Sequence, residues 1–377
     1  MEAMPRANAT AKTPMATHHA EAAPRAAGLT KLRFGFIAWV VLYHLDLALD
    51  VSAELPWLKP VLGRGYLGVD GFFLLSGFAM WLGYSARPPK DWPAIRQFLV
   101  RRLAKIWPLH ALALLALALL VGLAIASGIG IRAPERFNPR DLLLQLLLVN
   151  AWETMSAHAW NYPSWALSAE WAGYLAFPLL LGVLLKLPAR AVPSVVVVAF
   201  LGLCLLPYAD PGSGLNLTLH FGLARFFLEF VLGMALARWN PGRGLKLAAL
   251  ALPLGLALRL DPLAVAGLAA LIAWAWRWPQ PARPDLLVRL GEASFGVYLC
   301  WIFVEAALVG VLRLTEPGLV GRIGLLALGF LVNLVAGWCA WRWVEVPMHR
   351  WVVGLLRPAP GRRLSPQQIA DWLAGRG

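Results

Sequence analysis

Long runs of apolar residues recur along the chain, separated by short polar or basic segments. Each run has about 20 residues, enough for a helix to cross a hydrocarbon core of roughly 30 Å. The runs are continuous rather than alternating, so they predict helices and not the strands of a membrane barrel. Ten spans are predicted, near residues 33–50, 66–84, 107–128, 165–185, 192–209, 219–238, 244–259, 260–277, 286–312 and 320–344.

Composition agrees with this pattern. The 377 residues are 59% hydrophobic and 14% charged, a balance unlike that of a soluble domain, so the expected fold class is an all-α integral membrane protein. The net charge of +14 resides in short clusters between the apolar runs, which favours membrane lipids over nucleic acid as a partner. Cys204, Cys300 and Cys339 lack metal-ligand spacing, so no metal site is predicted.

The distribution of basic residues predicts the orientation. With the N-terminus inside, most of the 34 Lys and Arg residues fall in cytoplasmic segments, and both termini are expected to be cytoplasmic. Residues 1–30 are expected to form a disordered tail without a cleavable signal, and 31–350 the transmembrane domain. In the tail 351–377, a capping pattern at Ser365, Pro366 and Gln368 predicts a short amphipathic helix on the inner surface, with a frayed end as the alternative.

The segment "DLLLQLLLVNAW", residues 141–152, is apolar but short and carries Gln145 and Asn150. If it crossed the membrane, every later loop would change sides, and basic residues such as Arg238 would face outward. We therefore expect a re-entrant or interfacial helix on the outer side.

Arg33 and His44 lie in the first predicted span, on nearly the same helix face. The helix rises about 16 Å between them, so His44 would lie at or just beyond mid-depth if Arg33 is at the inner surface. Neutral imidazole is the cheapest general base to keep at that depth. A structural histidine bonded to a neighbouring helix is the alternative.

Charged groups inside a membrane need a partner, an aqueous cavity or a function. Asp70, in "GVDGFFLLSGF", enters the second span from the outer side at a height that could approach His44. Glu170, in "YPSWALSAEWAGYLAFPLL", enters the fourth span from outside with no basic residue within one turn. Both are candidate site residues. Arg225 and Glu229 are i and i+4 in the sixth span, and we expect them to form a structural pair.

The inner segment "RQFLVRRLAKIWPLH" carries Arg96, Arg101, Arg102 and Lys105. Arg102 and Lys105 are three residues apart, so both could bind one anion, with ordinary basic flanking of a span as the alternative. The basic cluster lies on the inner side and His44 toward the outer half. This arrangement favours transfer of a group from a cytoplasmic phosphorylated carrier to an external hydroxyl. His44 would take the hydroxyl proton while a carboxylate orients its ring.

These stretches, in this order, resemble the membrane-bound acyltransferase family 3, which includes bacterial enzymes that O-acetylate or O-succinylate cell-surface polysaccharides and glycans. Arg33 and His44 fit the family's pattern of arginine, ten residues, histidine. The other similar stretches are "GVDGFFLLSGF", "RRLAKIWPL", "SWALSAEWAGYLAFPLL", "GEASFGVYLCWIF" and "WRWVEVP", so the similarity covers about residues 29–350.

The resemblance implies an O-acyltransferase of the bacterial cytoplasmic membrane that moves an acyl group, acetyl first, from cytoplasmic acyl-CoA to a hydroxyl of a carbohydrate or glycolipid. The implied catalytic residues are His44, Asp70 and Glu170, with Glu170 on the acceptor side. The residues implied near the donor's phosphates are Arg33, Arg101, Arg102 and Lys105. The sequence departs from the family at Lys105, where a second arginine is usual, and at Trp301, where histidine is frequent.

Two other functions remain open from the sequence. A ten-span bundle with intramembrane charges also describes a transporter or flippase of a lipid-linked glycan, although no internal repeat supports it. A second possibility is an acyltransferase homologue that serves as a structural or regulatory subunit, which the retention of Arg33 and His44 disfavours.

Overall fold

The computed structural model describes residues 27–355, apart from 129, 132, 243, 280 and 282. The described chain is helical and contains no strand. The predicted amphipathic helix after Ser365 lies outside the described residues, as does most of the predicted N-terminal tail. The first helix begins at Ala27, so the last four residues of that predicted tail are helical rather than disordered.

The α-helices, in chain order, are α1 Ala27–Leu49, α2 Val51–Glu54, α3 Lys59–Leu62, α4 Leu67–Tyr84, α5 Trp92–Ala126, α6 Pro139–Leu146, α7 Trp165–Lys186, α8 Val192–Leu205, α9 Gly222–Trp239, α10 Leu245–Ala248, α11 Ala251–Leu258, α12 Asp261–Ala275, α13 Leu286–Glu292, α14 Ser294–Thr315, α15 Leu319–Ala340 and α16 Val346–Leu355. Short 3₁₀ turns lie at Pro56–Leu58, Pro134–Phe137, Tyr162–Ser164, Ala189–Ala191 and Leu206–Tyr208. A π-helical turn, Trp341–Glu345, joins α15 to α16.

Seven helical stretches of the described chain are long and apolar enough to cross a membrane, so the protein is a multi-pass membrane protein. They are Ala27–Leu49, Pro56–Tyr84, Trp92–Ala126, Tyr162–Lys186, Ala189–Tyr208, Ser294–Thr315 and Leu319–Leu355. The other three predicted spans also coincide with helices. However, α9 has 18 residues and carries three charges, while α10 to α12 are short. The count of ten is therefore not confirmed.

The segment predicted to be re-entrant, residues 141–152, is helical only in its first half, as part of α6, which has eight residues. An α-helix of that length spans about 12 Å, far less than a hydrocarbon core. Asn138 caps α6 by accepting a hydrogen bond from the backbone nitrogen of Asp141 at 2.9 Å. Residues 147–161 then run without helix to the turn before α7.

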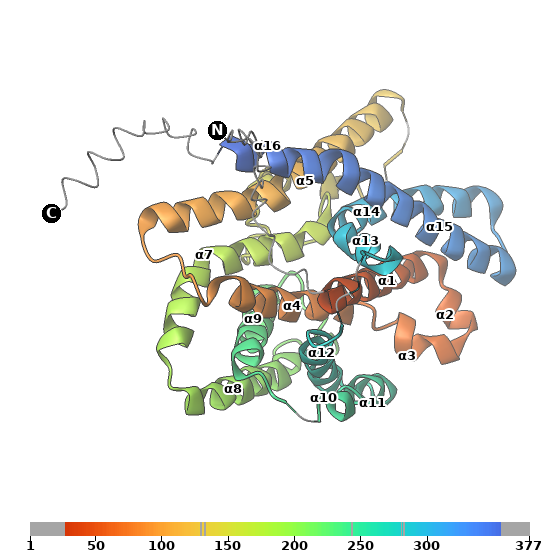
Figure 1. The fold of residues 1–377 in the computed structure, drawn as a ribbon. Coiled ribbons are helices and arrows are strands. Elements are labelled where there is room, and N and C mark those ends of the chain that lie inside the picture. Colours follow the sequence, from red (N-terminus) through yellow and green to blue (C-terminus); the bar gives the residue numbers. More distant parts are fainter. Residues whose placement is uncertain are drawn as a thin grey trace, which may run out of the picture.

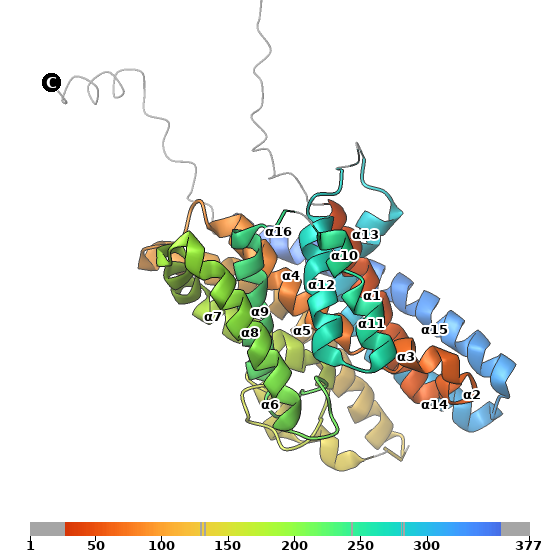
Figure 2. The same cartoon turned by 90° about the horizontal axis from the view of Figure 1, so that it is seen from below.

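Helix α1 lies in the middle of the bundle and contacts α4, α12, α14 and α15 (Figure 1). Figure 2, seen from below, shows α8 beside α9 and α11 beside α12. Exposed apolar side chains such as Leu179, Val198 and Val335 cover the outside of the bundle, as expected for helices in lipid. The buried core and the lipid-facing surface are both apolar, so the polar residues inside the bundle stand out.

Two close helix contacts hold the centre together. A Cβ on Gly77 of α4 would lie 1.9 Å from the carbonyl oxygen of Phe230, and one on Gly233 of α9 would lie 2.1 Å from that of Leu74. No real Cβ could lie so close to a carbonyl oxygen, so only glycine fits at these two positions, and α4 and α9 pack backbone to backbone.

Candidate active site

The imidazole of His44 is fixed by its own helix and by an aromatic neighbour. Its Nδ1 lies 2.8 Å from the carbonyl oxygen of Val40, so this nitrogen carries the proton and donates it. The ring of Trp301 lies 4.0 Å from the His44 ring, centroid to centroid, at an angle of 36°. A backbone carbonyl therefore orients His44, and the expectation that a carboxylate does so is wrong. The unprotonated Nε2 is left to accept a proton.

His44 lines a cavity of about 1010 Å³, which we call the His44 cavity. Its polar lining residues are Tyr43, His44, Tyr66, Arg136, His158, Tyr162, Asn216, Thr218, Arg225, Tyr298, Glu305 and Arg313. The apolar part of the wall comes mainly from α5 and α14. A cavity of this size with aromatic walls and scattered hydroxyl, amide and carboxylate groups suits a sugar-sized polar molecule or a larger amphipathic one.

His158 is in the loop before α7, outside the candidate spans. Burial and the nearby positive charge of Arg136 lower the pKa of His158. Its Nε2 lies 3.4 Å from the Thr218 hydroxyl oxygen. At neutral pH this second imidazole of the His44 cavity is therefore uncharged.

A second cavity, of about 170 Å³, contains the predicted anion-binding residues, and we call it the basic cavity. Arg33, Arg102 and Lys105 all line it, although they come from α1 and α5. The rest of its wall is mostly apolar and includes Phe72, Leu75, Met80, Ile106 and Phe295. A charged region beside an apolar wall matches a ligand with an anionic part and an uncharged arm. Arg101 is exposed and does not line this cavity.

Arg102 is surrounded by aromatic rings. Its guanidinium carbon lies 5.3 Å from the ring centroid of Tyr84, 5.6 Å from that of Phe98 and 5.4 Å from that of Tyr174. The Arg102 side chain also donates a hydrogen bond to the Tyr84 hydroxyl at 3.0 Å. These contacts hold the planar cation in one orientation at the cavity wall.

Glu170 lies in the basic cavity and does not line the His44 cavity. It accepts hydrogen bonds from the Tyr174 hydroxyl at 2.5 Å and from the Ser76 hydroxyl at 3.2 Å. The structure therefore brings Glu170 together with Arg33, Arg102 and Lys105 and not with His44, while its predicted place on the acceptor side stays a prediction. Through Tyr174, Glu170 positions one ring of the aromatic enclosure around Arg102.

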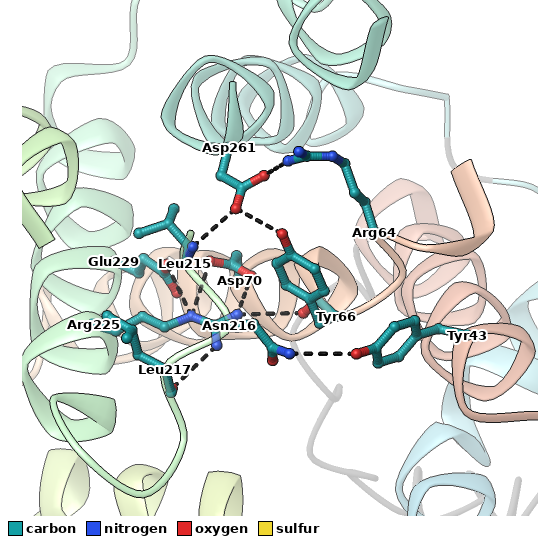
Figure 3. Close-up of polar contacts among 10 residues, drawn as sticks. All are labelled: Tyr43, Arg64, Tyr66, Asp70, Leu215, Asn216, Leu217, Arg225, Glu229 and Asp261. Carbon is teal, nitrogen blue, oxygen red and sulfur yellow. Dashed lines mark hydrogen bonds and ion pairs between the residues drawn. The ribbon is translucent and has the colours of Figure 1, made fainter. Parts of the chain in front are cut away.

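Asp70 lines neither cavity and is fully buried. It forms an ion pair with Arg225, whose Nε donates to Asp70 Oδ1 at 3.1 Å while a second guanidinium nitrogen bonds Oδ2 (Figure 3). The Glu229 carboxylate is 3.8 Å from Arg225 Nε, beyond hydrogen-bonding distance. The expectation that Asp70 serves His44 is therefore wrong, and Asp70 rather than Glu229 is the principal partner of Arg225.

The same region anchors the loop before α9. Arg225 donates to the carbonyl oxygens of Leu217 and Tyr66, both at 3.3 Å (Figure 3). Asp261, at the start of α12, accepts from the Tyr66 hydroxyl at 2.7 Å and from the Leu215 nitrogen at 2.9 Å. Gly214 has φ +59°, and a Cβ there would lie 2.4 Å from the Asp261 carboxylate. These bonds fix one wall of the His44 cavity.

Two further residues belong with the site, although sequence reasoning gave them no role in it. Trp301 is fully buried, and its indole, in place of the frequent histidine, packs at a tilt against the His44 ring. Glu345 is buried in the π-helical turn, which contacts α5, the helix that carries Arg102 and Lys105. One of its carboxylate oxygens has no hydrogen-bond partner in the described structure. A π-helical turn is itself frequent at functional sites. Among the described residues, no group of three metal-ligating side chains could hold a metal ion.

Comparison with known proteins identifies the class. The model of the acyltransferase 3 family, described as an acyltransferase domain, matches residues 27–342, so the chain belongs to this family. It is 32% identical over 331 residues to the acyltransferase MdmB of Streptomyces mycarofaciens, covering 78% of this chain and 83% of that protein. No solved structure matches the chain. These findings support acyl transfer and favour it over the transporter alternative.

Proposed function

We propose that this protein is an O-acyltransferase of the bacterial cytoplasmic membrane that uses cytoplasmic acyl-CoA, with acetyl as the first candidate, and a carbohydrate or glycolipid hydroxyl as acceptor. The observation that carries the proposal is the arrangement around His44. Its Nδ1 is occupied by Val40, its ring is packed against Trp301, and it lines the large cavity. The nitrogen left for chemistry, Nε2, is the one that can accept a hydroxyl proton.

The acyl-CoA donor would bind in the basic cavity, which is lined by other residues of the helices that line the His44 cavity. Arg33, Arg102 and Lys105 would hold the phosphates of CoA, and the apolar wall of the basic cavity would receive its uncharged arm. Glu170 would act on this side as a positioning residue through Tyr174. In this proposal Asp70 has no contact with either substrate and serves to fix α4 against α9.

The reaction would proceed by attack of the acceptor hydroxyl oxygen on the thioester carbonyl. His44 Nε2 takes the hydroxyl proton as the new carbon–oxygen bond forms. The carbon–sulfur bond then breaks, and the proton passes from His44 to the thiolate of CoA. The products are an ester and free CoA, and His44 returns to its neutral form. General-base assistance of this kind contributes about 10²- to 10⁴-fold to the rate.

The test uses the purified chain in detergent with radiolabelled acetyl-CoA and n-octyl glucoside as a defined glycosidic acceptor. CoA release and labelled ester are measured for the native protein, for His44→Gln and for His220→Gln. His220 is a suitable control because its side chain is 63% exposed and it lines neither cavity.

The expected result is ester formation by the native protein and by His220→Gln, and a loss of about 10²-fold or more in His44→Gln. Binding of acetyl-CoA to His44→Gln should stay close to native, because His44 is not in the basic cavity. Equal rates in all three proteins would refute the role of His44. Binding without turnover in the native chain would refute the acyltransferase assignment for this acceptor class.

A further inference from the structure

The two cavities meet at one place in the bundle. Of the described residues, Val69 and Tyr298 line both the basic cavity and the His44 cavity. Five of the described helices, α1, α4, α5, α7 and α14, contribute lining residues to both cavities. On α1, for example, Arg33 lines the basic cavity and His44 the other, while on α14 Phe295 lines the basic cavity and Ile302 the other. Val69 and Tyr298 therefore stand between the two cavities, at the junction where these come closest.

Val69 is held firmly in this position. It is 6% exposed, and its β-branched side chain has little rotamer freedom in a helix. On one side of it, a Cβ on Gly68 would lie 2.6 Å from the carbonyl oxygen of Phe36, and on the other, one on Gly71 would lie 2.8 Å from the Phe36 ring. The next residue, Asp70, is ion-paired with Arg225. Helix α4 is thus pressed against α1 and bonded to α9 around Val69.

Tyr298 is also fixed. Its hydroxyl donates a hydrogen bond to the carbonyl oxygen of Pro163 at 2.6 Å, which ties α14 to the turn before α7. Its ring is 9% exposed. Two residues earlier, a Cβ on Gly296 would lie 2.3 Å from the carbonyl oxygen of Gly337, so α14 packs closely on α15. Neither side of the junction can move aside without breaking a contact of the core.

We propose that Val69 and Tyr298 determine which acyl chain lengths the enzyme accepts. The inference rests on the proposed function, in which the donor's phosphates are in the basic cavity and the acceptor hydroxyl is beside His44. The thioester carbonyl must then lie near the junction, and the carbon chain attached to it must fit beside Val69 and Tyr298. Because both side chains are fixed, each extra methylene of the acyl group meets the junction and disfavours binding.

The experiment measures the binding of acetyl-, propanoyl-, butanoyl- and hexanoyl-CoA to the purified chain by titration calorimetry, which needs no acceptor. Val69→Ala removes two methyl groups at the junction, and Val69→Ile adds one. Tyr298→Phe keeps the ring and removes its anchor to Pro163. Val41→Ala is the matched control, because Val41 is fully buried on α1 and lines neither cavity.

Val69→Ala should raise the affinity for butanoyl-CoA relative to acetyl-CoA by about tenfold, the low end of what one methylene contributes in an apolar pocket. Val69→Ile should lower the affinity for propanoyl-CoA relative to acetyl-CoA by a similar factor. Tyr298→Phe should change the ratio in the direction of Val69→Ala but less. Val41→Ala should leave every ratio as in the native protein, even if it lowers stability.

The same proteins are assayed for CoA release with n-octyl glucoside, which separates this inference from the proposed function. If the proteins turn over but every Val69 variant keeps the native affinity ratios between longer acyl-CoAs and acetyl-CoA, the role of the junction is refuted and acyl transfer is supported. If these affinity ratios change in the Val69 variants as predicted but no protein turns over, the role of the junction is supported and the proposed reaction is refuted. Binding of no acyl-CoA by the native chain would overturn both.

Discussion

The buried ion pair between Asp70 and Arg225 leads to a prediction that separates structure from catalysis. Asp70→Ala would leave the Arg225 guanidinium fully buried without its two hydrogen-bonded carboxylate contacts. Removing one partner of a buried pair costs about 3 to 5 kcal/mol. At about 2 °C per kcal/mol for a large domain, the midpoint of thermal unfolding should fall by about 6 to 10 °C.

Glu229→Gln provides the comparison within the same cluster. Glu229 approaches Arg225 only to 3.8 Å, and neither of its carboxylate oxygens has a hydrogen-bond partner in the described structure. Its amide replacement keeps the volume and breaks no hydrogen bond to Arg225, so the change in stability should stay below about 1 kcal/mol, or about 2 °C. The pair of variants therefore tests which carboxylate neutralises Arg225.

The assay is thermal unfolding in detergent, followed by a thiol-reactive fluorescent dye that reports exposure of the partly buried cysteines Cys204, Cys300 and Cys339. CoA release is measured in parallel at a temperature where both variants are folded. Asp70→Ala should lower turnover less than His44→Gln does, because Asp70 itself lines neither cavity and acts only through its partner Arg225. Native-like stability of Asp70→Ala, an equal loss of stability in Glu229→Gln, or a loss of turnover by folded Asp70→Ala as large as that of His44→Gln would each contradict these assignments.

Three further predictions concern Arg102 and Trp301 at the site and Asp285 outside it. Arg102→Lys keeps the positive charge but loses the planar guanidinium that lies among three aromatic rings, so the dissociation constant for CoA, measured by calorimetry, should rise about tenfold. An unchanged dissociation constant would exclude Arg102 from phosphate binding. Trp301→Phe should keep most of the turnover because a ring still packs on His44, whereas Trp301→Ala should lose turnover and about 3 to 5 kcal/mol of stability. Equal losses in the two variants would argue against a role for the ring contact. The bond to Lys31 lowers the pKa of Asp285, so this contact stabilises the fold above the pKa of the unfolded chain, and the stabilisation is lost as the pH falls through the folded-state pKa. Asp285→Asn should remove this part of the acid dependence of thermal unfolding, and a pH profile identical to that of the native protein would contradict the prediction.

The sequence was sufficient to predict features that depend on local spacing. Arg33 and His44 are on one helix, so their separation along it followed from helical rise, and they do line opposite cavities. Arg102 and Lys105, three residues apart, do share a cavity wall. The helical fold and the family were also predictable, because apolar run length and motif order are properties of the linear sequence.

Features that depend on packing were not predictable in this way. The sequence indicated how deep Glu170 lies in the bundle but not which cavity it faces. It comes five residues after Trp165, about 140° around the helix, so Trp165 lines the His44 cavity while Glu170 lines the other. Asp70 and Arg225 are 155 residues apart, and local spacing favoured Glu229 as the partner of Arg225. The available signal for this ion pair was an unpaired Asp70 in one predicted span and an arginine in another.

The contact between α4 and α9 also has a consequence for how the chain enters the bilayer during synthesis. A charged residue inside the membrane disfavours insertion, and α9, which carries three charges, is not among the described helices that are long and apolar enough to cross a membrane by themselves. The ion pair of Arg225 with Asp70, supported by the close packing at Gly77 and Gly233, neutralises a charge in the first turn of each helix. Because α4 is made some 150 residues earlier, we expect the partner of Arg225 to be present before α9 is inserted.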